Sequence, residues 1–234
     1  MREPLDFTPL DDPFQNALTG PQAELAVVSG QIRRFRPDVS VFFGHPRELD
    51  DAAWASLRAL ASPGGVVSVR DRQTPLPPGW QLLESFELVQ YSGVDVAAGP
   101  LDGLVRLTAD DVPEMTALIE LTKPGPFLPH TIELGTYLGF RDDNGELIAM
   151  AGERLRPSSQ WREISAVCTA PPARGRGLAA RLVRAVISGI RDRGEQPFLH
   201  TTADNPATRL YESLGFVRRS EVILDILRAP NDNS

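Results

Sequence analysis

The chain has 234 residues, a length that corresponds to one large domain or two small ones and that suffices to bury a hydrophobic core. Its composition, 41% hydrophobic and 24% charged, excludes a disordered tail, a collagen-like chain and a coiled coil. The formal net charge of −7 disfavours a general nucleic-acid binder, and the single cysteine, Cys168, excludes an internal disulfide and a thiolate-rich metal site.

The sequence carries no signal for a membrane or for export. No apolar run approaches the roughly 20 residues that a membrane-spanning helix needs. The first residues, MREPLDFTPLDDPF, contain charges and prolines where a signal peptide has an apolar stretch. We therefore expect a soluble, cytoplasmic, globular protein with no membrane partner.

The first part of the chain has an α/β pattern with few chemical markers. Apolar residues at helical spacing, such as Leu25, Val28 and Ile32, predict helices, and short apolar runs such as VSVFFG predict strands. His45 follows one of these strands at a turn, where a structural role is favoured over a functional one. The expected elements are a helix over 23–34, a strand over 39–44, a helix over 51–61, a strand over 66–70 and an extended segment over 80–91.

A break in composition divides the chain near its middle. The stretch VDVAAGPLDG at 94–103 is small, flexible and turn-forming, which predicts an N-terminal α/β domain over 1–98 and a second domain over 99–234. The segments ESFELVQY and ESLGFVRRSEV echo each other faintly. This echo allows the first domain to be a degenerate copy of the second.

The second part predicts three consecutive antiparallel strands followed by alternating helices and strands. Asn144–Gly145 is a strong hairpin signal between the first two of these strands. Thr108 and Asp111 have the spacing of a capping box at the start of a helix. The expected strands are 104–107, 136–141, 146–154, 162–169, 198–202 and 216–227, and the expected helices are 108–121, 131–134, 178–193 and 206–214.

The segment VCTAPPARGRGLAA is the best chemical signal, because a strand runs through a glycine turn into a helix. The first N–H groups of a helix have no internal partner, and its dipole favours an anion there. Gly175 and Gly177 let a phosphate approach the backbone, and Arg174 and Arg176 add charge and forked donors. A glycine turn with two solvated arginines is the alternative interpretation.

Other phosphate-binding motifs fit this segment less well. The pattern GxxxxGK[ST] of a P-loop is absent. Gly175, Gly177 and Ala180 match the GxGxxA form of the dinucleotide fingerprint, but the preceding strands look antiparallel rather than part of a βαβ unit. A glycine-loop nucleotide binder is therefore a weaker alternative.

Three stretches in order, EISAVCTAPPARGRGLAARL, PFLHTTADN and RLYESLGF, resemble the GNAT superfamily of acetyl-coenzyme A-dependent N-acetyltransferases. Within it the chain resembles the bacterial subgroup akin to glycine N-acyltransferases, and the resemblance covers about 104–227. Arg174, Gly177 and Ala179 fill the family's loop pattern. The resemblance implies an α/β (α+β) fold with a mixed, mostly antiparallel twisted sheet flanked by helices, which splays between two central strands.

The resemblance also implies acetyl-CoA as co-substrate and no metal. It places the pantetheine arm in the splay and the pyrophosphate at the loop, although Pro171 and Pro172 can donate no N–H. Asn205 stands six residues before Tyr211, one fewer than the family often has, and its place before Pro206 also suits a helix cap. The implied cofactor-binding residues are Val167, Cys168, Thr169, Arg174, Gly175, Arg176, Gly177, Leu178, Ala179 and Asn205.

Amide formation from a thioester needs a deprotonated amine and a proton for the leaving thiolate. Glu163 is the candidate base, because strand alternation from Val167 would place both on one face; it could instead be exposed or paired with Arg162. Tyr211 is the candidate acid, with a core position as the alternative. His200 could contact substrate or belong to the core, and Cys168 is expected to be structural rather than a nucleophile.

We therefore expect an acyl-CoA-dependent N-acetyltransferase that acts on a small-molecule amine or amino acid by direct attack in a ternary complex. The acceptor would lie between the TKPGPF loop, the segment 131–137 and Glu163. A CoA-binding regulatory or vestigial domain without turnover is the alternative. No nucleic-acid partner is expected, and a homodimer is compatible with the sequence.

Overall fold

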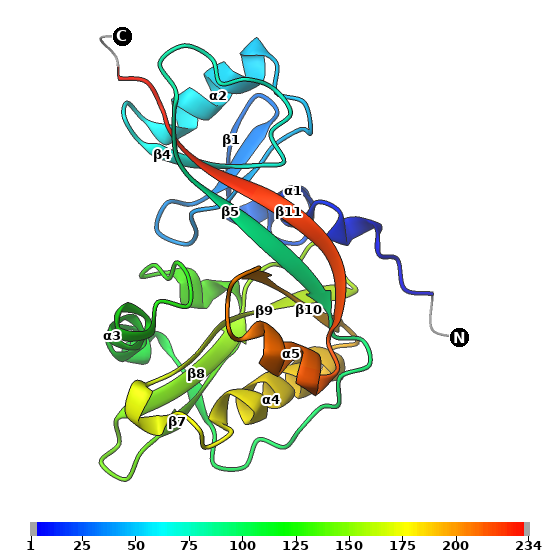
Figure 1. The fold of residues 1–234 in the computed structure, drawn as a ribbon, viewed down its shortest axis with the longest axis vertical. Helices are drawn as coiled ribbons and strands as arrows, with labels where there is room; N and C mark the ends of the chain where they lie inside the picture. Colours follow the sequence, from blue (N-terminus) through cyan, green and yellow to red (C-terminus); the bar gives the residue numbers. More distant parts are fainter. Residues whose placement is uncertain (1–3, 232–234) are drawn as a thin grey trace.

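The computed structural model describes residues 4–231, and a twisted sheet of eight strands runs through the molecule (Figure 1). The strand order is β4-β11-β5-β10-β9-β8-β7-β6, and every neighbouring pair is antiparallel except β9 and β10. This confirms the mixed, mostly antiparallel sheet. The strands are β4 (Val66–Arg70), β5 (Gln81–Ser92), β6 (Val105–Leu107), β7 (Tyr137–Arg141), β8 (Leu147–Glu153), β9 (Trp161–Thr169), β10 (Gln196–Thr202) and β11 (Val217–Arg228).

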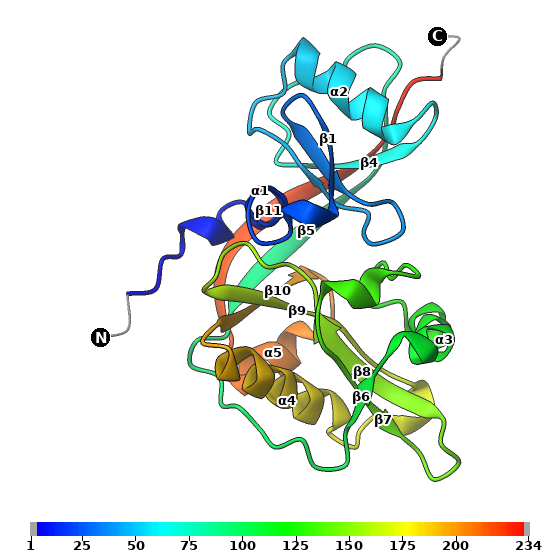
Figure 2. The same ribbon diagram turned by 180° about the vertical axis from the view of Figure 1, so that it is seen from behind.

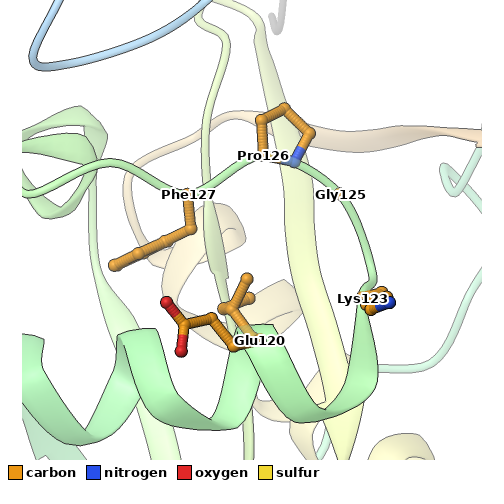
Figure 3. A pocket seen from close by; sticks show the side chains of 6 residues that line it. Glu120, Lys123, Gly125, Pro126 and Phe127 are labelled. Atoms are coloured by element: carbon orange, nitrogen blue, oxygen red, sulfur yellow. The ribbon is translucent and has the colours of Figure 1, made fainter.

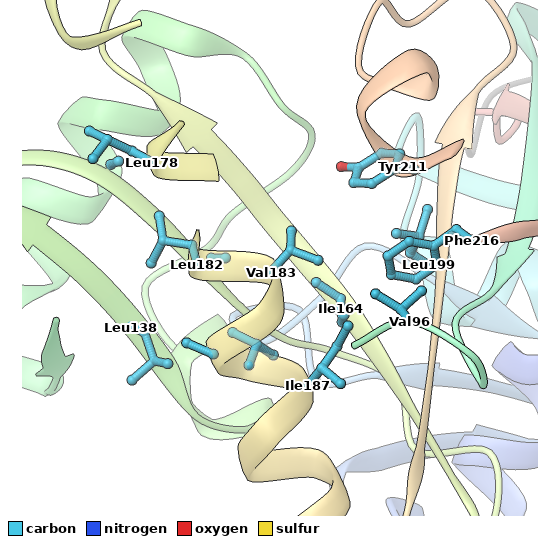
Figure 4. Close-up of a cluster of buried hydrophobic side chains, with 14 of the residues drawn as sticks. Val96, Leu138, Ile164, Leu178, Leu182, Val183, Ile187, Leu199, Tyr211 and Phe216 are labelled. Carbon is cyan, nitrogen blue, oxygen red and sulfur yellow. The ribbon is translucent and has the colours of Figure 1, made fainter. Parts of the chain in front are cut away.

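Helices cover both faces of the lower half of this sheet (Figures 1 and 2). On one face α3 (Val112–Thr122) buries Met115, Leu118 and Ile119 against β7–β9. On the other face lie α4 (Leu178–Asp192) and α5 (Thr208–Leu214). The apolar stripe of α4 packs with Ile164 of β9 and Leu199 of β10 in one cluster (Figure 4). Two helical layers therefore sandwich the strands that carry the candidate site.

A smaller lobe is built from residues 4–70. It holds a three-stranded sheet of β1 (Ala26–Ser29), β2 (Ile32–Phe35) and β3 (Phe43–Gly44), with α1 (Pro13–Thr19) and α2 (Asp51–Ala61). Two further apolar clusters join it to the long sheet. One contains Trp54, Val67 and Leu227, and the other contains Phe14 and Phe198.

Long-range pairing connects the two parts of the chain. The long strands β5 and β11 run from one lobe into the other, and β11 also pairs with β4 (Figure 1). Strands from before and after residue 98 therefore alternate in the sheet. The expected division into domains 1–98 and 99–234 stays a prediction.

The predicted helix over 23–34 is wrong, because this segment is a β-hairpin. Two extended runs flank the turn at Gly30, whose φ of +53° suits a glycine, and β1 pairs with β2 in antiparallel register. The expected strand over 39–44 is also too long, since only Phe43–Gly44 pairs with β2. In both places the prediction followed an apparent helical or apolar periodicity, whereas the observed structure consists of short β-strands separated by turns.

Most other expected elements are confirmed. Helix α2 and strand β4 have the predicted bounds, and the strands of the second part lie within a few residues of the expected ranges. The capping box of Thr108 and Asp111 is formed, at the start of a short 3-10 turn that leads into α3. Gly145 closes the β7–β8 hairpin with a φ of +86°. No helix within residues 4–231 combines the length and apolar character needed to cross a membrane.

Candidate active site

Strands β9 and β10 diverge soon after they meet. Their parallel pairing covers only three positions and ends where Glu163 faces Phe198. Beyond this point a β-bulge breaks the β8–β9 register, and the bulged residue Ala166 has a φ of +54°. The structure therefore has a splay between its two central strands, at the place that the resemblance implied.

The backbone of β9 turns some of its groups toward this splay. Ala170 donates its N–H to Ile148 of β8 at 2.8 Å. Because backbone groups alternate sides along a strand, the N–H groups of Val167 and Thr169 face away from β8, toward the splay. The same alternation turns the N–H of Cys168 toward β8. The geometry thus suits the implied pantetheine contacts at Val167 and Thr169 and argues against one from the Cys168 N–H.

The start of α4 has the features of an anion site. Gly177 is its N-cap in a left-handed conformation, with a φ of +71° and no side chain that caps the helix, and its first turn holds no acidic residue. Gly175 has a φ of +77°. A Cβ built on either glycine meets no atom within 4 Å, so the loop is open at these two positions, beside a helix start whose first N–H groups have no intrahelical partner. The loop therefore leaves room for an anion, and a diphosphate group at this place stays a prediction.

The two loop arginines flank this helix start differently. Arg174 donates from Nε to the carbonyl oxygen of Thr169 at 3.2 Å, which ties the loop to the end of β9. Arg174 and Arg176 are both exposed, as are Gly175 and Gly177. Their roles toward a cofactor, with those of Leu178 and Ala179, stay predictions.

Tyr211 lies on α5 within the apolar cluster that α4 forms with the sheet, and its side chain is largely buried. It contacts the rings of Tyr91 and Phe216, and its hydroxyl points toward the side of β9 and α4 (Figure 4). Within residues 4–231 this hydroxyl has no hydrogen-bond partner. Burial, with a smaller contribution from Cys168, raises the pKa of Tyr211 to about 12, so the phenol is neutral at physiological pH.

Glu163 is fully buried and tightly paired. Arg154 donates from Nε and Nη2 to its two carboxylate oxygens at 2.7 Å each, and His200 Nδ1 lies 2.7 Å from Oε1. Burial alone would raise the pKa of Glu163, but the charge and hydrogen bonds of Arg154, together with His200, lower it to about 2. A carboxylate with so low a pKa accepts a proton poorly near neutral pH.

The expectation that Glu163 and Val167 share one face is wrong. Ile164 and Val167, three positions apart, both contact the cluster on the α4 side, because the bulge at Ala166 adds a residue between them. Glu163 precedes Ile164 and therefore faces the opposite side, toward the small lobe. The alternative pairing with Arg162 is not formed either, since Arg162 pairs with Glu195 at 3.2 Å.

His200 makes two hydrogen bonds within the protein. Its Nε2 lies 3.0 Å from Nε2 of Gln90, and its Nδ1 contacts Glu163. Its ring also stacks near Phe14 of the small lobe, at 6.0 Å between centroids. The structure thus places His200 among core partners. Sequence reasoning did not identify Arg154 or Gln90, because neither belongs to a motif. Arg154 meets Glu163 only through the pairing of β8 with β9, and Gln90 lies far away in the chain.

Cys168 and Asn205 have local structural partners. Burial raises the pKa of the Cys168 thiol to about 11, against smaller opposing effects of Thr122 and Met150, which suits a structural thiol. Asn205 accepts from the Ala207 N–H through Oδ1 at 2.9 Å and stands three residues before α5 begins. A contact between Asn205 and a cofactor stays a prediction.

The expected acceptor region borders a shallow surface hollow of about 470 Å³ between the end of α3 and the TKPGPF loop (Figure 3). Glu120 and Lys123 lie at its rim with the apolar side chain of Phe127. On the inner side Phe127 packs edge-on against Tyr137, whose buried hydroxyl has no partner within residues 4–231. The position of the acceptor stays a prediction.

Comparisons with known proteins agree with this geometry. The model of the family described as FR47-like protein matches residues 137–223, which include the splay, the glycine loop and Tyr211. No curated protein matches the chain.

Two solved structures resemble the whole chain. A protein of the GNAT acetyltransferase family from Novosphingobium aromaticivorans DSM 12444 is 42% identical, with a TM-score of 0.85 over 95% of this chain and 99% of that one. A GCN5-related N-acetyltransferase from Kribbella flavida is 17% identical, with a TM-score of 0.59 over 94% of this chain and 96% of that one. At that identity the second similarity concerns the fold alone.

Proposed function

The chain belongs to the GNAT family of acetyltransferases, and we propose that it transfers an acetyl group from acetyl-CoA to a primary amine of a small molecule or amino acid. The observation that carries this proposal is the uncapped start of α4, with two left-handed glycines in open space beside a splayed strand pair. The glycine N-acyltransferase-like subgroup, the cytoplasmic location, the homodimer and the expectation of no metal stay predictions.

The protein would hold the co-substrate mainly through its backbone. The N–H groups from Gly175 to Ala179, with Arg174 and Arg176, would bind the diphosphate, and the free groups of Val167 and Thr169 would bind the pantetheine arm. When bound, acetyl-CoA supplies an activated acetyl thioester. The chain's part is to orient the thioester in the splay and to exclude water from it.

Tyr211 is the proposed proton donor. A phenol with a pKa of about 12 stays protonated at neutral pH, and its Oη, free of partners within residues 4–231, can give a proton to the leaving thiolate. This keeps the role that its place in the RLYESLGF stretch implies.

Glu163 receives a different role from the one its sequence suggests. Its carboxylate is occupied by Arg154 and His200, so we assign it to positioning rather than to proton abstraction. The ammonium form of the acceptor would lose one proton to water, and the free amine would attack the thioester carbonyl. As the C–N bond forms and the C–S bond breaks, the thiolate would take the Tyr211 proton and the nitrogen's second proton would pass to the phenolate.

Release of free CoA thiol with a panel of primary amines tests the reaction. We expect turnover with at least one small amine or amino acid, and a 1:1 complex with acetyl-CoA by calorimetry. Binding without turnover across the panel would favour the CoA-binding domain without activity. Absence of binding would refute the proposed function.

Gly177→Ala tests whether the start of α4 holds the diphosphate. A Cβ there projects into open space over the N–H groups, and we expect the Kd for acetyl-CoA to rise about tenfold or more, since roughly 1.4 kcal/mol corresponds to a factor of ten. Gly194→Ala is the matched control. Gly194 has a similar φ of +80° and equally open surroundings, but it follows the far end of α4, roughly 22 Å away. Equal affinities of the two variants would contradict the assignment.

A further inference from the structure

A buried chain of polar side chains crosses the closed end of the splay, and the proposed chemistry does not use it. It runs from Arg154 through Glu163 and His200 to Gln90 and Arg219. Arg154 directly follows β8, and the other four residues belong to β9, β10, β5 and β11 in turn. These hydrogen-bonded side chains therefore connect the end of β8 with the four strands that follow it in the sheet order, from β9 to β11.

The bond between His200 and Glu163 has a special place in this chain. Backbone pairing of β9 with β10 ends at Glu163 and Phe198, and His200 lies two residues further along β10. Its 2.7 Å contact with Glu163 is thus the cross-strand link immediately beyond the last backbone pair. Both side chains are almost fully excluded from solvent, at 3% and 0% exposed. A hydrogen bond in such surroundings is stronger than one in water.

The orientation of His200 is fixed by its neighbours. Arg219 donates from Nη1 to Oε1 of Gln90 at 2.9 Å, so the amide nitrogen of Gln90 faces His200. That nitrogen is a donor, which makes Nε2 of His200 an acceptor and leaves the proton on Nδ1, where it bonds to Glu163. Both ring nitrogens are engaged, so this histidine is not a free proton acceptor.

The small lobe holds the other side of the chain. Gln90 also donates to the carbonyl oxygen of Leu10 at 2.9 Å, Phe14 stacks on the His200 ring, and Arg154 lies over the ring of Phe42 at 4.8 Å. The position of the two strands is thereby coupled to residues before 43.

We propose that His200 is a positioning residue: its bond to Glu163 is a strut that sets the spacing of β9 and β10 where the splay opens, and the small lobe holds that strut in place. The inference rests on the proposed function, since the spacing matters because the pantetheine arm would enter there. Loss of the strut leaves the backbone groups of Val167 and Thr169 poorly placed for that arm without removing any group that takes part in proton transfer.

His200→Ala tests the strut by removing both bonds, and His200→Asn tests rescue, because the Asn amide can donate where Nδ1 does. We expect the Kd and KM for acetyl-CoA to rise at least tenfold in His200→Ala, with kcat changed less than threefold. We expect His200→Asn to stay within about threefold of the wild type, since roughly 0.65 kcal/mol separates values that differ threefold.

His45→Ala is the matched control, because it should destabilise the fold and leave the spacing of β9 and β10 unchanged. His45 is also buried and also makes two hydrogen bonds, to Pro46 and to the Arg70 N–H, but it lies in the small lobe beside β4. It should lower the Tm comparably and leave the Kd for acetyl-CoA unchanged. Equal Kd values for His200→Ala and His45→Ala, measured where both are folded, would overturn the strut.

Hydrogen exchange without ligand keeps this inference separate from the proposed function. In His200→Ala we expect faster exchange in peptides covering 164–169 and 199–202 than in His45→Ala, because the strands are no longer linked beyond their last pair. Equal exchange in both variants would refute the strut even if the enzyme is active. Failure of the wild type to bind acetyl-CoA would instead refute the proposed function, with the exchange data still deciding the strut.

Discussion

Tyr211 has a largely buried side chain, and its hydroxyl points toward β9 and α4 without a hydrogen-bond partner within residues 4–231 (Figure 4). We expect Tyr211→Phe to lower kcat by about 10²–10⁴ with little change in KM, the usual range for loss of a general acid. The ratio of wild-type to variant rates should stay constant from pH 6 to 9, because a pKa of about 12 keeps the phenol protonated throughout.

Tyr91→Phe supplies the control for this prediction. Tyr91 lies next to Tyr211 and donates its own hydroxyl to Glu212 at 3.0 Å. Removing that hydroxyl should leave kcat near the wild-type value. Equal rates for Tyr211→Phe and the wild type would show that Tyr211 is a core residue only.

The Glu163 carboxylate should make the free energy of unfolding depend on pH in the acidic range. Its pKa falls from 4.5 to about 2 on folding, because Arg154 and His200 outweigh the effect of burial. A carboxyl with a depressed pKa stabilises the folded state above its unfolded pKa, and this contribution disappears as the pH falls from about 4.5 toward 2. The size is roughly 3 kcal/mol.

Urea unfolding at a series of pH values measures this effect. Glu163→Gln should be less stable than the wild type at pH 7, and the difference should shrink steadily below pH 4.5. Glu221→Gln removes an exposed carboxylate paired with Arg218 and should keep the acid slope of the wild type. A constant difference between Glu163→Gln and the wild type down to pH 2 would contradict the assigned pKa.

Short sequence motifs point to single residues of the candidate site, but they do not predict which side chains surround those residues. The glycine loop and Tyr211 lie in short motifs, so the sequence alone suggests them, and their roles stay predictions. The partners of Glu163 come from the end of β8 and from β10, and their meeting depends on the register of three strands. No local pattern carries that register, which is why the sequence suggested a free base where the fold has a closed ion pair.

Secondary-structure elements were predicted best where a clear turn or capping residue marks their end. The β7–β8 hairpin has an Asn-Gly turn and α2 has an Asp cap, and both were placed correctly. The hairpin around Gly30 was mistaken for a helix because Leu25, Val28 and Ile32 also fit a helical period. The bulge at Ala166 had no sequence signal, and it reversed the face assigned to Glu163.

The cap of α2 gives a test at this scale. Asp50 accepts the Ala53 N–H through Oδ1 at 2.8 Å, and Asp50→Ala should lower the free energy of unfolding by about 1 kcal/mol. Asp50→Asn should retain most of the stability, because Asn caps helices about as well as Asp. Chemical denaturation measures both variants. An unchanged midpoint in Asp50→Ala would show that the cap contributes nothing.

The whole molecule depends on pairing that crosses the expected domain boundary. Strand β11 lies between β4 and β5, and apolar cluster residues of the small lobe pack against Trp161 and Phe198. We therefore expect one cooperative unfolding transition in calorimetry, with coincident tryptophan fluorescence and circular dichroism. Two separated transitions would support the independent domains that composition suggests.

A fragment of residues 99–234 provides a second test at this scale. It lacks β4 and β5, so β11 would have no neighbour on either edge. We expect it to be insoluble or to lack a cooperative transition, since open strand edges promote aggregation. A soluble fragment with a sharp transition would support the boundary at residue 98.

The threading of β11 between two early strands also constrains biosynthesis. Ribosomes deliver β4 and β5 long before residue 228, so during most of translation these strands wait without the neighbour that separates them. The small lobe can form its own hairpin and helices meanwhile, but β11 can join it to the rest of the sheet only after this strand has left the ribosome. When chaperones are depleted, newly made chains should therefore associate through the unpaired edges of β4 and β5.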